Sequence, residues 1–388
     1  MRISKICIGV LAATFLAGCA AVHSTDKDVG QELSRFVDDH KTQVLDVEQG
    51  ASGAVVVTTT EETVVAYLEQ KKNPNIVVRR LPEAVSLGDV AAGVVSVPVA
   101  AIHRAPKSSS EIISEALMGT PVYMLEKDGW WRVQTPEGYH GWVNGLQVIA
   151  MTPEDFQAHF QKPQAMVTAL EVEVSSEDGR QTVTTLTAGS LVSVVKELGK
   201  QTLIALPDGR TGRIDTQALQ SLDRVYQALP EVQMREKIAQ NALKLIGRSY
   251  RWAGVSTFGV DGSGLVKVAW QMAGLVGPRD ADEMAVLPQR LPADTQTFEA
   301  GDLLFFGNAK SVNHVAIGLG GTRFVHAWGD VRVGDLNAAS AEYDKSAKDT
   351  FMFAVRPEMN GQCIRPMTDL PLFAGKPVKP ELCKLKIR

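Results

Sequence analysis

Apolar and polar residues alternate in short stretches over residues 96–150 and, more weakly, over residues 164–225. Alternation of this kind is typical of strands that bury one face. Farther along, over residues 232–246 and 263–273, apolar residues recur every three or four positions, as in an amphipathic helix. The pattern therefore predicts a β-rich middle of the chain, followed by a part in which helices and strands are mixed.

The first part of the chain has a less regular pattern. Residues 54–57 are an apolar run typical of a strand, and residues 61–70 have the spacing of a helix. We interpret residues 19–80 as a polar tether followed by an N-terminal α/β subdomain that packs against the rest of the chain.

Short turns divide the β-rich middle into two units. In residues 81–150 the turns fall at residues 127–129 and 136–138, which predicts a small antiparallel barrel. Residues 206–214 repeat the second of these turns and its flanking strands, but without the aromatic residues. This internal repeat predicts a second, similar barrel over residues 164–225.

Length and charge narrow the class of protein. The 388 residues, 45% of them hydrophobic and 22% charged, suit a globular protein of two or three domains. The formal net charge of −4 and the lack of a basic run argue against a nucleic-acid partner. No motif predicts a cofactor, and the oligomeric state stays open.

The N-terminus resembles a lipoprotein signal. Arg2 and Lys5 precede an apolar run over residues 6–16, which is too short to span a membrane, and the sequence LAGC ends at Cys19. The resemblance implies removal of residues 1–18, lipidation of Cys19 and a membrane anchor. Because Ala20, and not an acidic residue, directly follows Cys19, we expect an outer-membrane protein that faces the periplasm. A plain signal peptide with an incidental cysteine is the alternative.

The sequence contains four cysteines, which separate by position. Cys7 lies in the signal segment and Cys19 is the expected lipidation site, so Cys363 and Cys383 remain. In an oxidising compartment such a pair predicts a disulfide that fastens the C-terminal tail, residues 359–388. Two unconnected thiols are the alternative.

Residues 250–266 have the composition of a functional site. Tyr250 and a nearby tryptophan precede a glycine-rich turn, and Asp261 opens the helix of residues 263–273. The positive end of a helix favours a thiolate, so a nucleophilic cysteine would be activated at this helix start. Gly262 occupies that position instead. A helix start tolerates a small side chain, so we expect one to fit there at a cost below about 1 kcal/mol.

This stretch resembles the NlpC-type cell-wall cysteine peptidases, whose pattern is Y-x-W-x-G-x-S-x-x-G-x-D-C-S-G-L. Residues 250–265 read YRWAGVSTFGVDGSGL, so only the cysteine is replaced, by Gly262. The match spans residues 233–358 and continues in the family's order through Pro278-Arg279-Asp280, Gly301-Asp302-Leu303-Leu304-Phe305-Phe306, His314-Val315-Ala316-Ile317 and His326. The resemblance implies an α+β papain-like domain, and enzymes of this type cut the peptide stems of bacterial peptidoglycan.

The first barrel has its own resemblance, to bacterial SH3-like domains. Residues 129–133 (GWWRV) and 138–143 (GYHGWV) are the signature pieces. In NlpC-type proteins with paired SH3-like domains, the first barrel flanks the groove and restricts it to stems with a free N-terminal L-Ala. The fold class predicted for the whole chain is therefore two small all-β SH3-like barrels and a C-terminal α+β papain-like domain.

Two histidines are candidates for catalysis. His314 opens an apolar strand pattern and His326 ends the next one, so a hairpin would place the two side by side. By resemblance, His314 would be the general base or imidazolium partner, and His326 the residue that orients it. Metal binding is another use for two histidines, but no third ligand of clear spacing accompanies them.

The resemblance also implies contacts with the substrate. Tyr250, Asp261 and Ser263 of the central stretch would border the stem peptide. In the first barrel we expect Trp131 and Trp142 to fill the core, which leaves Tyr139 as the candidate for ligand contact.

Three hypotheses about function follow from the missing cysteine. The first is a non-catalytic lipoprotein that binds peptidoglycan stem peptides. The second is an active endopeptidase of the γ-D-glutamyl-L-diamino acid type, which uses Ser263 or a water held by His314. The third is a scaffold whose groove recruits another cell-wall enzyme. Since Gly262 has no side chain that can attack a peptide, we expect the first.

Overall fold

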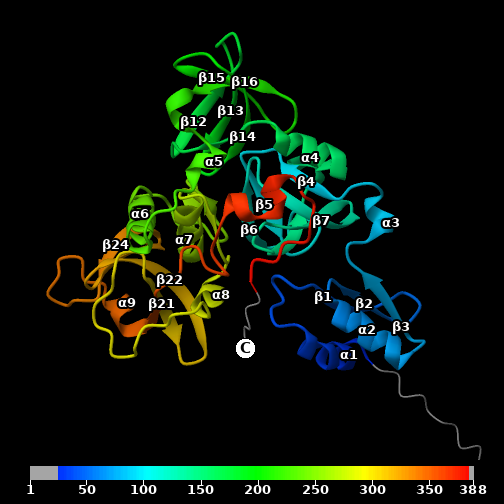
Figure 1. Cartoon of the computed structure of the whole chain (residues 1–388). Coiled ribbons are helices and arrows are strands. Elements are labelled where there is room, and N and C mark those ends of the chain that lie inside the picture. Colours follow the sequence, from blue (N-terminus) through cyan, green and yellow to red (C-terminus); the bar gives the residue numbers. More distant parts are fainter. Residues whose placement is uncertain (1–24, 384–388) are drawn as a thin grey trace, which may run out of the picture.

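The computed structural model describes residues 25–383. The expected signal segment and the expected lipidation site Cys19 lie outside this range. Within it, no helix is long and apolar enough to cross a membrane. An N-terminal α/β unit, two β-barrels and a C-terminal α+β domain follow one another along the chain (Figure 1). The predicted fold class is confirmed.

The N-terminal unit is a small three-stranded sheet with helices. Its elements are α1 (Asp26–Leu33), β1 (Leu45–Gln49), β2 (Val55–Thr59), α2 (Glu62–Lys71) and β3 (Ile76–Arg80). β2 pairs antiparallel with β1 and parallel with β3, and α2 makes the crossover. Its core includes Leu33, Val57 and Val64. The apolar run and the helical spacing read from the sequence correspond to β2 and α2.

The first barrel has seven strands. They are β4 (Ala92–Val95), β5 (Val99–His103), β6 (Ile112–Leu117), β7 (Pro121–Asp128), β8 (Trp130–Gln134), β9 (His140–Val143) and β10 (Val148–Met151). The order in the sheet is β10-β4-β7-β8-β9-β5-β6. Alternate residues such as Val122, Met124 and Val133 fill the core, as the alternation in the sequence predicts.

The second barrel repeats this topology after α4 (Pro153–Gln161). Its strands are β11 (Gln164–Val167), β12 (Glu171–Ser175), β13 (Thr182–Thr187), β14 (Leu191–Glu197), β15 (Gln201–Ala205), β16 (Thr211–Asp215) and β17 (Leu219–Ser221). The order β17-β11-β14-β15-β16-β12-β13 matches the first barrel strand for strand. The weak repeat in the sequence therefore corresponds to a repeated fold.

The C-terminal domain packs two helices on an antiparallel sheet. The helices are α6 (Glu231–Leu243) and α7 (Gly262–Gln271); the strands are β21 (Leu303–Asn308), β22 (Ser311–Gly320), β23 (Arg323–Trp328), β24 (Asp330–Asp335) and β25 (Phe351–Val355). The sheet order is β24-β23-β22-β21-β25. Two short strands, β18 (Val255–Ser256) and β19 (Gly259–Val260), precede α7, and α8 (Ala281–Ala285) and α9 (Lys345–Thr350) complete the domain. The core includes Leu265, Trp270 and Ile317.

Two element boundaries differ from the sequence-based expectation. α6 ends at Leu243, three residues early, because the chain turns at Gly247, whose φ is +81°. β22 begins at Ser311, so His314 lies inside the strand, where it pairs with Phe306 of β21. The expectation that His314 opens its strand was wrong, because the β21–β22 hairpin continues three residues beyond it.

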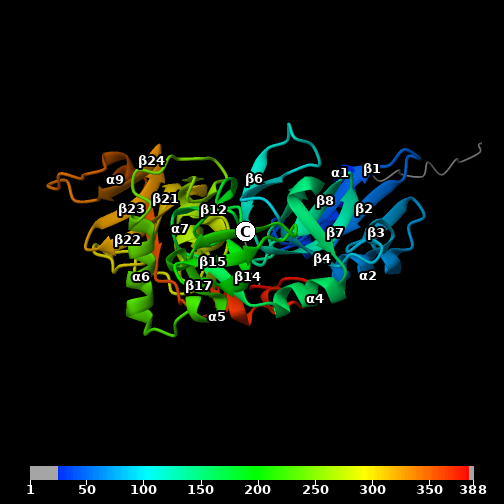
Figure 2. The ribbon, with the colours of Figure 1, turned by 90° about the horizontal axis from the view of Figure 1, so that it is seen from above.

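The C-terminal tail returns to the other units. A disulfide joins Cys363 and Cys383. Between them, Leu372 packs with Phe156 of α4 in a core that includes residues of β4. Nζ of Lys379 then contacts Glu61 of the N-terminal unit, 3.2 Å from its Oε1. Figure 2 shows the N-terminal unit and the C-terminal domain at opposite sides of the first barrel, so the tail ties three units together.

Candidate functional site

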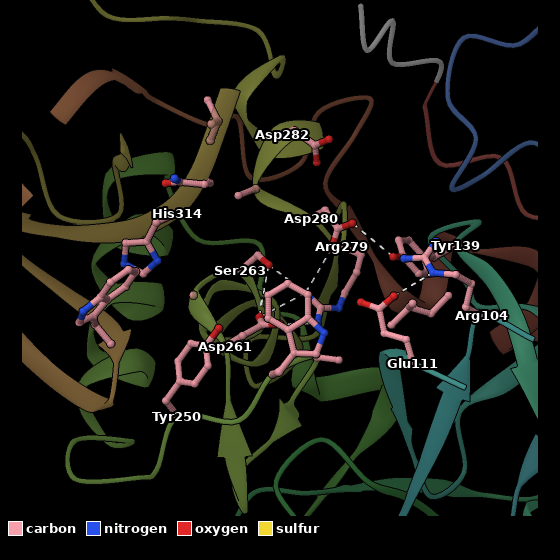
Figure 3. Close-up of a pocket in the computed structure, with 18 residues that line it drawn as sticks. Arg104, Glu111, Tyr139, Tyr250, Asp261, Ser263, Arg279, Asp280, Asp282 and His314 are labelled. Atoms are coloured by element: carbon pink, nitrogen blue, oxygen red, sulfur yellow. Dashed lines mark hydrogen bonds and ion pairs between the residues drawn. The ribbon is translucent and has the colours of Figure 1, made fainter. Parts of the chain in front are cut away.

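A cavity of about 290 Å³ lies between the first barrel and the C-terminal domain (Figure 3). We call it the central cavity. The first barrel contributes four lining residues, namely Arg104, Glu111, Ile113 and Tyr139. The C-terminal domain contributes Tyr250, Trp252, Ala253, Asp261, Gly262, Ser263, Arg279, Asp280, Ala281, Asp282, Val312, Asn313, His314 and Trp328. Five of the residues expected at the site from the sequence, together with the empty position Gly262, therefore meet at one place.

The start of α7 forms the floor of the central cavity. Asp261 caps the helix, because its Oδ1 accepts a hydrogen bond of 2.6 Å from the Gly264 amide. Gly264 lets the helix approach the preceding loop closely, since a Cβ there would lie 1.9 Å from the carbonyl oxygen of Gly254. The glycines and the cap together place Gly262 in the first turn of the helix.

Gly262 faces the ring of His314. A Cβ added at Gly262 would lie 2.6 Å from Nδ1 and 2.8 Å from Cε1 of His314. The backbone at Gly262 is not left-handed, so the obstacle to a side chain is this ring. A small side chain at Gly262 therefore requires the imidazole of His314 to move, and the expected cost below about 1 kcal/mol stays a prediction.

His314 and His326 form the pair expected from the sequence. Nε2 of His314 lies 3.2 Å from Nδ1 of His326, and Nε2 of His326 lies 3.7 Å from Oδ2 of Asp344. His326 does not line the central cavity; it lies behind His314, beside a second cavity of about 130 Å³ that both histidines border. The order Gly262, His314, His326 is the order that a nucleophile, a base and an orienting residue would need.

Burial sets the protonation of the two rings. Burial, with a smaller effect of His326, lowers the pKa of His314 to about 3. Burial lowers the pKa of His326 to about 4, although the charge of Asp344 acts in the opposite direction. Both rings are therefore neutral near pH 7, and one proton between them makes the hydrogen bond.

Arg279 holds the other side of the helix start. Its side chain is 1% exposed, with Nη2 2.8 Å from Oδ2 of Asp261 and Nη1 donating to Oγ of Ser263 at 2.8 Å. Nε donates to Oγ of Ser114 in β6, so the same guanidinium binds the first barrel. Burial disfavours its charge, but Asp261 and Asp280 outweigh that effect and raise the pKa of Arg279.

This network occupies the polar atoms of two residues expected to contact the substrate. The carboxylate of Asp261 caps α7 and pairs with Arg279, and the hydroxyl of Ser263 accepts from Arg279 and donates to Asp261. In the sequence, Arg279 is recognisable only as part of the motif Pro278-Arg279-Asp280. Its position beside Asp280 was the one indication of a buried ion pair, because a buried arginine needs carboxylate partners.

The first barrel brings Tyr139 to the cavity wall. Its hydroxyl donates to Oδ2 of Asp280 at 3.2 Å (Figure 3). Burial, helped by the charge of Asp280, raises the pKa of Tyr139, so the hydroxyl keeps its proton. Trp131 belongs to the barrel core and Trp142 is also buried, as expected for both.

The part of the chain between residues 25 and 383 contains no cluster of three or more histidine, cysteine, aspartate or glutamate residues suited to a metal ion. The site is therefore described by its polar side chains alone.

Comparison with known proteins identifies the family of two of the domains. The model of the NlpC/P60 family matches residues 247–350, and the model of the bacterial SH3 domain matches residues 98–146. The dipeptidyl-peptidase 6 of Lysinibacillus sphaericus is 30% identical over 240 residues, which cover 59% of this chain and 84% of that protein. The γ-D-glutamyl-L-lysine dipeptidyl-peptidase of Bacillus subtilis is 28% identical over 233 residues, 56% of this chain and 72% of that protein.

A solved structure supports the fold. An NlpC/P60 family protein from Bacillus cereus superposes with a TM-score of 0.57 at 19% identity, over 68% of this chain and 99% of that protein. The expected SH3-like barrel and papain-like domain are thus confirmed.

The histidine pair leads to a prediction about pH. The folded pKa values, about 3 for His314 and about 4 for His326, lie below the value of about 6.5 in an unfolded chain. The unfolded state therefore takes up protons first, and stability is highest above pH 6.5 and falls as the pH drops toward 4. We expect about 2 kcal/mol of lost unfolding free energy per ring between pH 7.5 and pH 5.

Nuclear magnetic resonance of the imidazole carbons checks this expectation, with resonances assigned by a His314→Asn variant. Neutral rings at pH 5 are expected. Titration of both rings near pH 6.5 would contradict the description of the pair.

Proposed function

We propose that this chain, which belongs to the NlpC/P60 family, is a cell-envelope lipoprotein that binds peptidoglycan stem peptides without cutting them. The observation that carries the proposal is the start of α7, where Gly262 faces Nδ1 of His314 and offers no group that could attack a peptide bond. The cavity around this position is kept, with about 290 Å³ of space and a polar lining. A cavity with a polar lining beside a position that has no nucleophile favours ligand binding over peptide hydrolysis.

The size of the expected loss supports the inactivity. A cysteine peptidase depends on a thiolate that a helix start and an imidazole activate. In a well-studied serine protease, removal of the nucleophile lowers turnover by about 10⁶-fold. The helix start and the imidazole of His314 are both present in this chain, and the resemblance in sequence puts the missing thiol at Gly262.

The relatives suggest the class of ligand. One of them is named for the bond between γ-D-glutamate and L-lysine, which occurs in stem peptides. We assign to the central cavity a stem peptide of the sequence L-Ala-γ-D-Glu-diamino acid with a free amino terminus. Tyr139 and Asp280 at the wall, and Tyr250 and Ser263 at the floor, would border it, and His314 would face the uncut bond.

The state of Ser263 supports binding over the second hypothesis. Its hydroxyl is engaged by Arg279 and Asp261, whereas Nδ1 of His314 points at Gly262. A serine nucleophile would need its hydroxyl bonded to the base.

The lipid anchor is part of the proposal. The sequence LAGC before and at Cys19 supports cleavage and lipidation at that residue. A single acyl chain binds a membrane only marginally, so the several chains of a bacterial lipoprotein would be needed for stable attachment. We place the protein at the outer membrane, facing the periplasm.

Binding without cleavage can be measured directly. Isothermal titration with L-Ala-γ-D-Glu-L-Lys should give saturable binding by the wild-type protein, because the cavity and its polar wall are intact. Mass spectrometry after prolonged incubation should find the tripeptide whole. Release of L-Ala-D-Glu by the wild type, lost in a Ser263→Ala variant, would support the hydrolase hypothesis instead. If the wild-type protein does not bind the tripeptide, the scaffold hypothesis is the one that remains.

The anchor has its own test. We expect a Cys19→Ser variant, produced in a bacterium with two membranes, to move from the membrane fraction to the soluble fraction, because its thiol can no longer be acylated. Metabolic labelling with a fatty acid gives the matched control, with label on the wild type alone. A Cys19→Ser protein that still sediments with outer membranes would show that lipidation is not what holds it there.

A further inference from the structure

A lysine of the N-terminal unit reaches the wall of the central cavity. Nζ of Lys41 lies 3.1 Å from Oδ2 of Asp280 and also contacts Oδ1 of Asp282. Both aspartates line the central cavity, and Figure 3 shows them on the same rim. Lys41 is not one of the lining residues, so it holds the two carboxylates from outside the cavity.

The first barrel fixes the loop that carries Lys41. Three successive carbonyl oxygens of this loop accept hydrogen bonds from it: His40 from Nε2 of His140 at 3.0 Å, Lys41 from the amide of His140 at 2.9 Å, and Thr42 from Nε2 of Gln134 at 2.8 Å. Burial lowers the pKa of His140 to about 3, so its ring is neutral with the proton on Nε2. The backbone of the loop is held before the ion pair forms.

This anchoring separates Lys41 from an ordinary surface lysine. Exposed ion pairs contribute little because two long side chains must lose freedom. Here the backbone is fixed, and the side chains of Lys41 and Asp280 are 28% and 27% exposed. Burial works against the charge of Lys41, but Asp280 and Asp282 outweigh it and raise the pKa of Lys41. The lysine therefore stays charged across the range in which the carboxylates are ionised.

The charges at this wall determine which ligand groups can bind beside it. Arg279 lies 2.8 Å from Oδ2 of Asp261 and 3.5 Å from Oδ1 of Asp280, so its single charge offsets one of these two carboxylates. Asp280, Asp282 and Lys41 then leave one net negative charge at the rim. Oδ1 of Asp282 is engaged by Lys41 and by the Glu283 amide, whereas Asp282 is 40% exposed and keeps its other oxygen for a ligand. One negative charge beside an available carboxylate oxygen suits one ammonium group.

We propose that Lys41 is a positioning residue of the ligand site, which fixes Asp280 and Asp282 so that the cavity wall binds the N-terminal ammonium group of a ligand. The N-terminal unit is then part of the site, although it contributes no lining residue. The inference rests on the proposed function, because the ammonium group is taken to be that of a stem peptide. Without Lys41, two like charges at the start of α8 repel each other, and Asp282 turns toward solvent.

The test uses the full-length protein in four forms. They are the wild type, Lys41→Met, Lys41→Arg and the control Lys71→Met, which removes a lysine of the same unit that pairs with Glu32. The probes are L-Ala-γ-D-Glu-L-Lys and its counterpart acetylated at the α-amino group. Lys41→Met should bind the free peptide about tenfold more weakly and lose most of the preference for it over the acetylated one. Lys41→Arg and Lys71→Met should stay within about threefold of the wild type.

Hydrogen exchange of residues 281–287 in the ligand-free forms gives a second readout. Faster exchange in Lys41→Met than in Lys71→Met is expected, because α8 loses its contact. Unchanged affinity, preference and exchange in Lys41→Met would overturn the inference, and so would a general loss of thermal stability with the preference unchanged. If no form binds the peptide, the proposed function fails. In that case, faster exchange in Lys41→Met would still support the positioning of α8 by Lys41, but the ligand assignment would be withdrawn.

Discussion

The buried ion pair between Arg279 and Asp261 is the interaction on which the site depends. A guanidinium that is 1% exposed must be paired, and removal of one partner of such a pair costs about 3–5 kcal/mol. Through this pair Arg279 fixes the cap of α7, and through Ser114 it fixes β6 of the first barrel. The position of Gly262 opposite His314 follows from the first contact, and the closed side of the cavity follows from the second. The same residue therefore maintains both the helix start and the wall.

The ligand site belongs to three units rather than to the peptidase-like domain alone. Glu115 of the first barrel is buried, its Oε2 accepts from the Val255 amide at 2.9 Å, and its Oε1 lies 3.2 Å from Arg251. Burial raises the pKa of Glu115, so the carboxylate depends on these partners to remain charged. The loop between Tyr250 and α7 is thus supported from the barrel, while Lys41 supports α8 from the N-terminal unit. The disulfide between Cys363 and Cys383 adds a covalent constraint within the tail. The neighbouring units thus supply or support walls of a cavity that the C-terminal domain lines only in part.

The periodicity of apolar residues predicts the helices and strands, whose positions depend on burial. It does not predict contacts between side chains that are distant in the sequence. The alternating positions and the repeated turn were sufficient for both barrels, and a count of cysteines was sufficient for the pair Cys363 and Cys383. The central stretch gave Asp261 as the helix cap, and the motif order brought His314 and His326 together. The roles of Arg279 and Lys41 were not predicted, because their partners are distant in the sequence: Asp261 and Ser114 for Arg279, and Asp280 and Asp282 for Lys41. The close packing of the His314 ring on Gly262, where an added Cβ would lie 2.6 Å from Nδ1, was likewise not predictable from periodicity.

We propose that this chain has a peptidase fold that lacks its nucleophile and little else. The most direct test of this proposal is single-turnover cleavage of L-Ala-γ-D-Glu-L-Lys by a Gly262→Cys variant. The new side chain requires His314 to shift, and the second cavity of about 130 Å³, which that ring also borders, offers room. The account predicts release of L-Ala-D-Glu by Gly262→Cys, none by the wild type, and none by Gly262→Cys combined with His314→Ala. A folded Gly262→Cys protein that binds the peptide and leaves it whole would contradict the account, as would equal cleavage by the wild type.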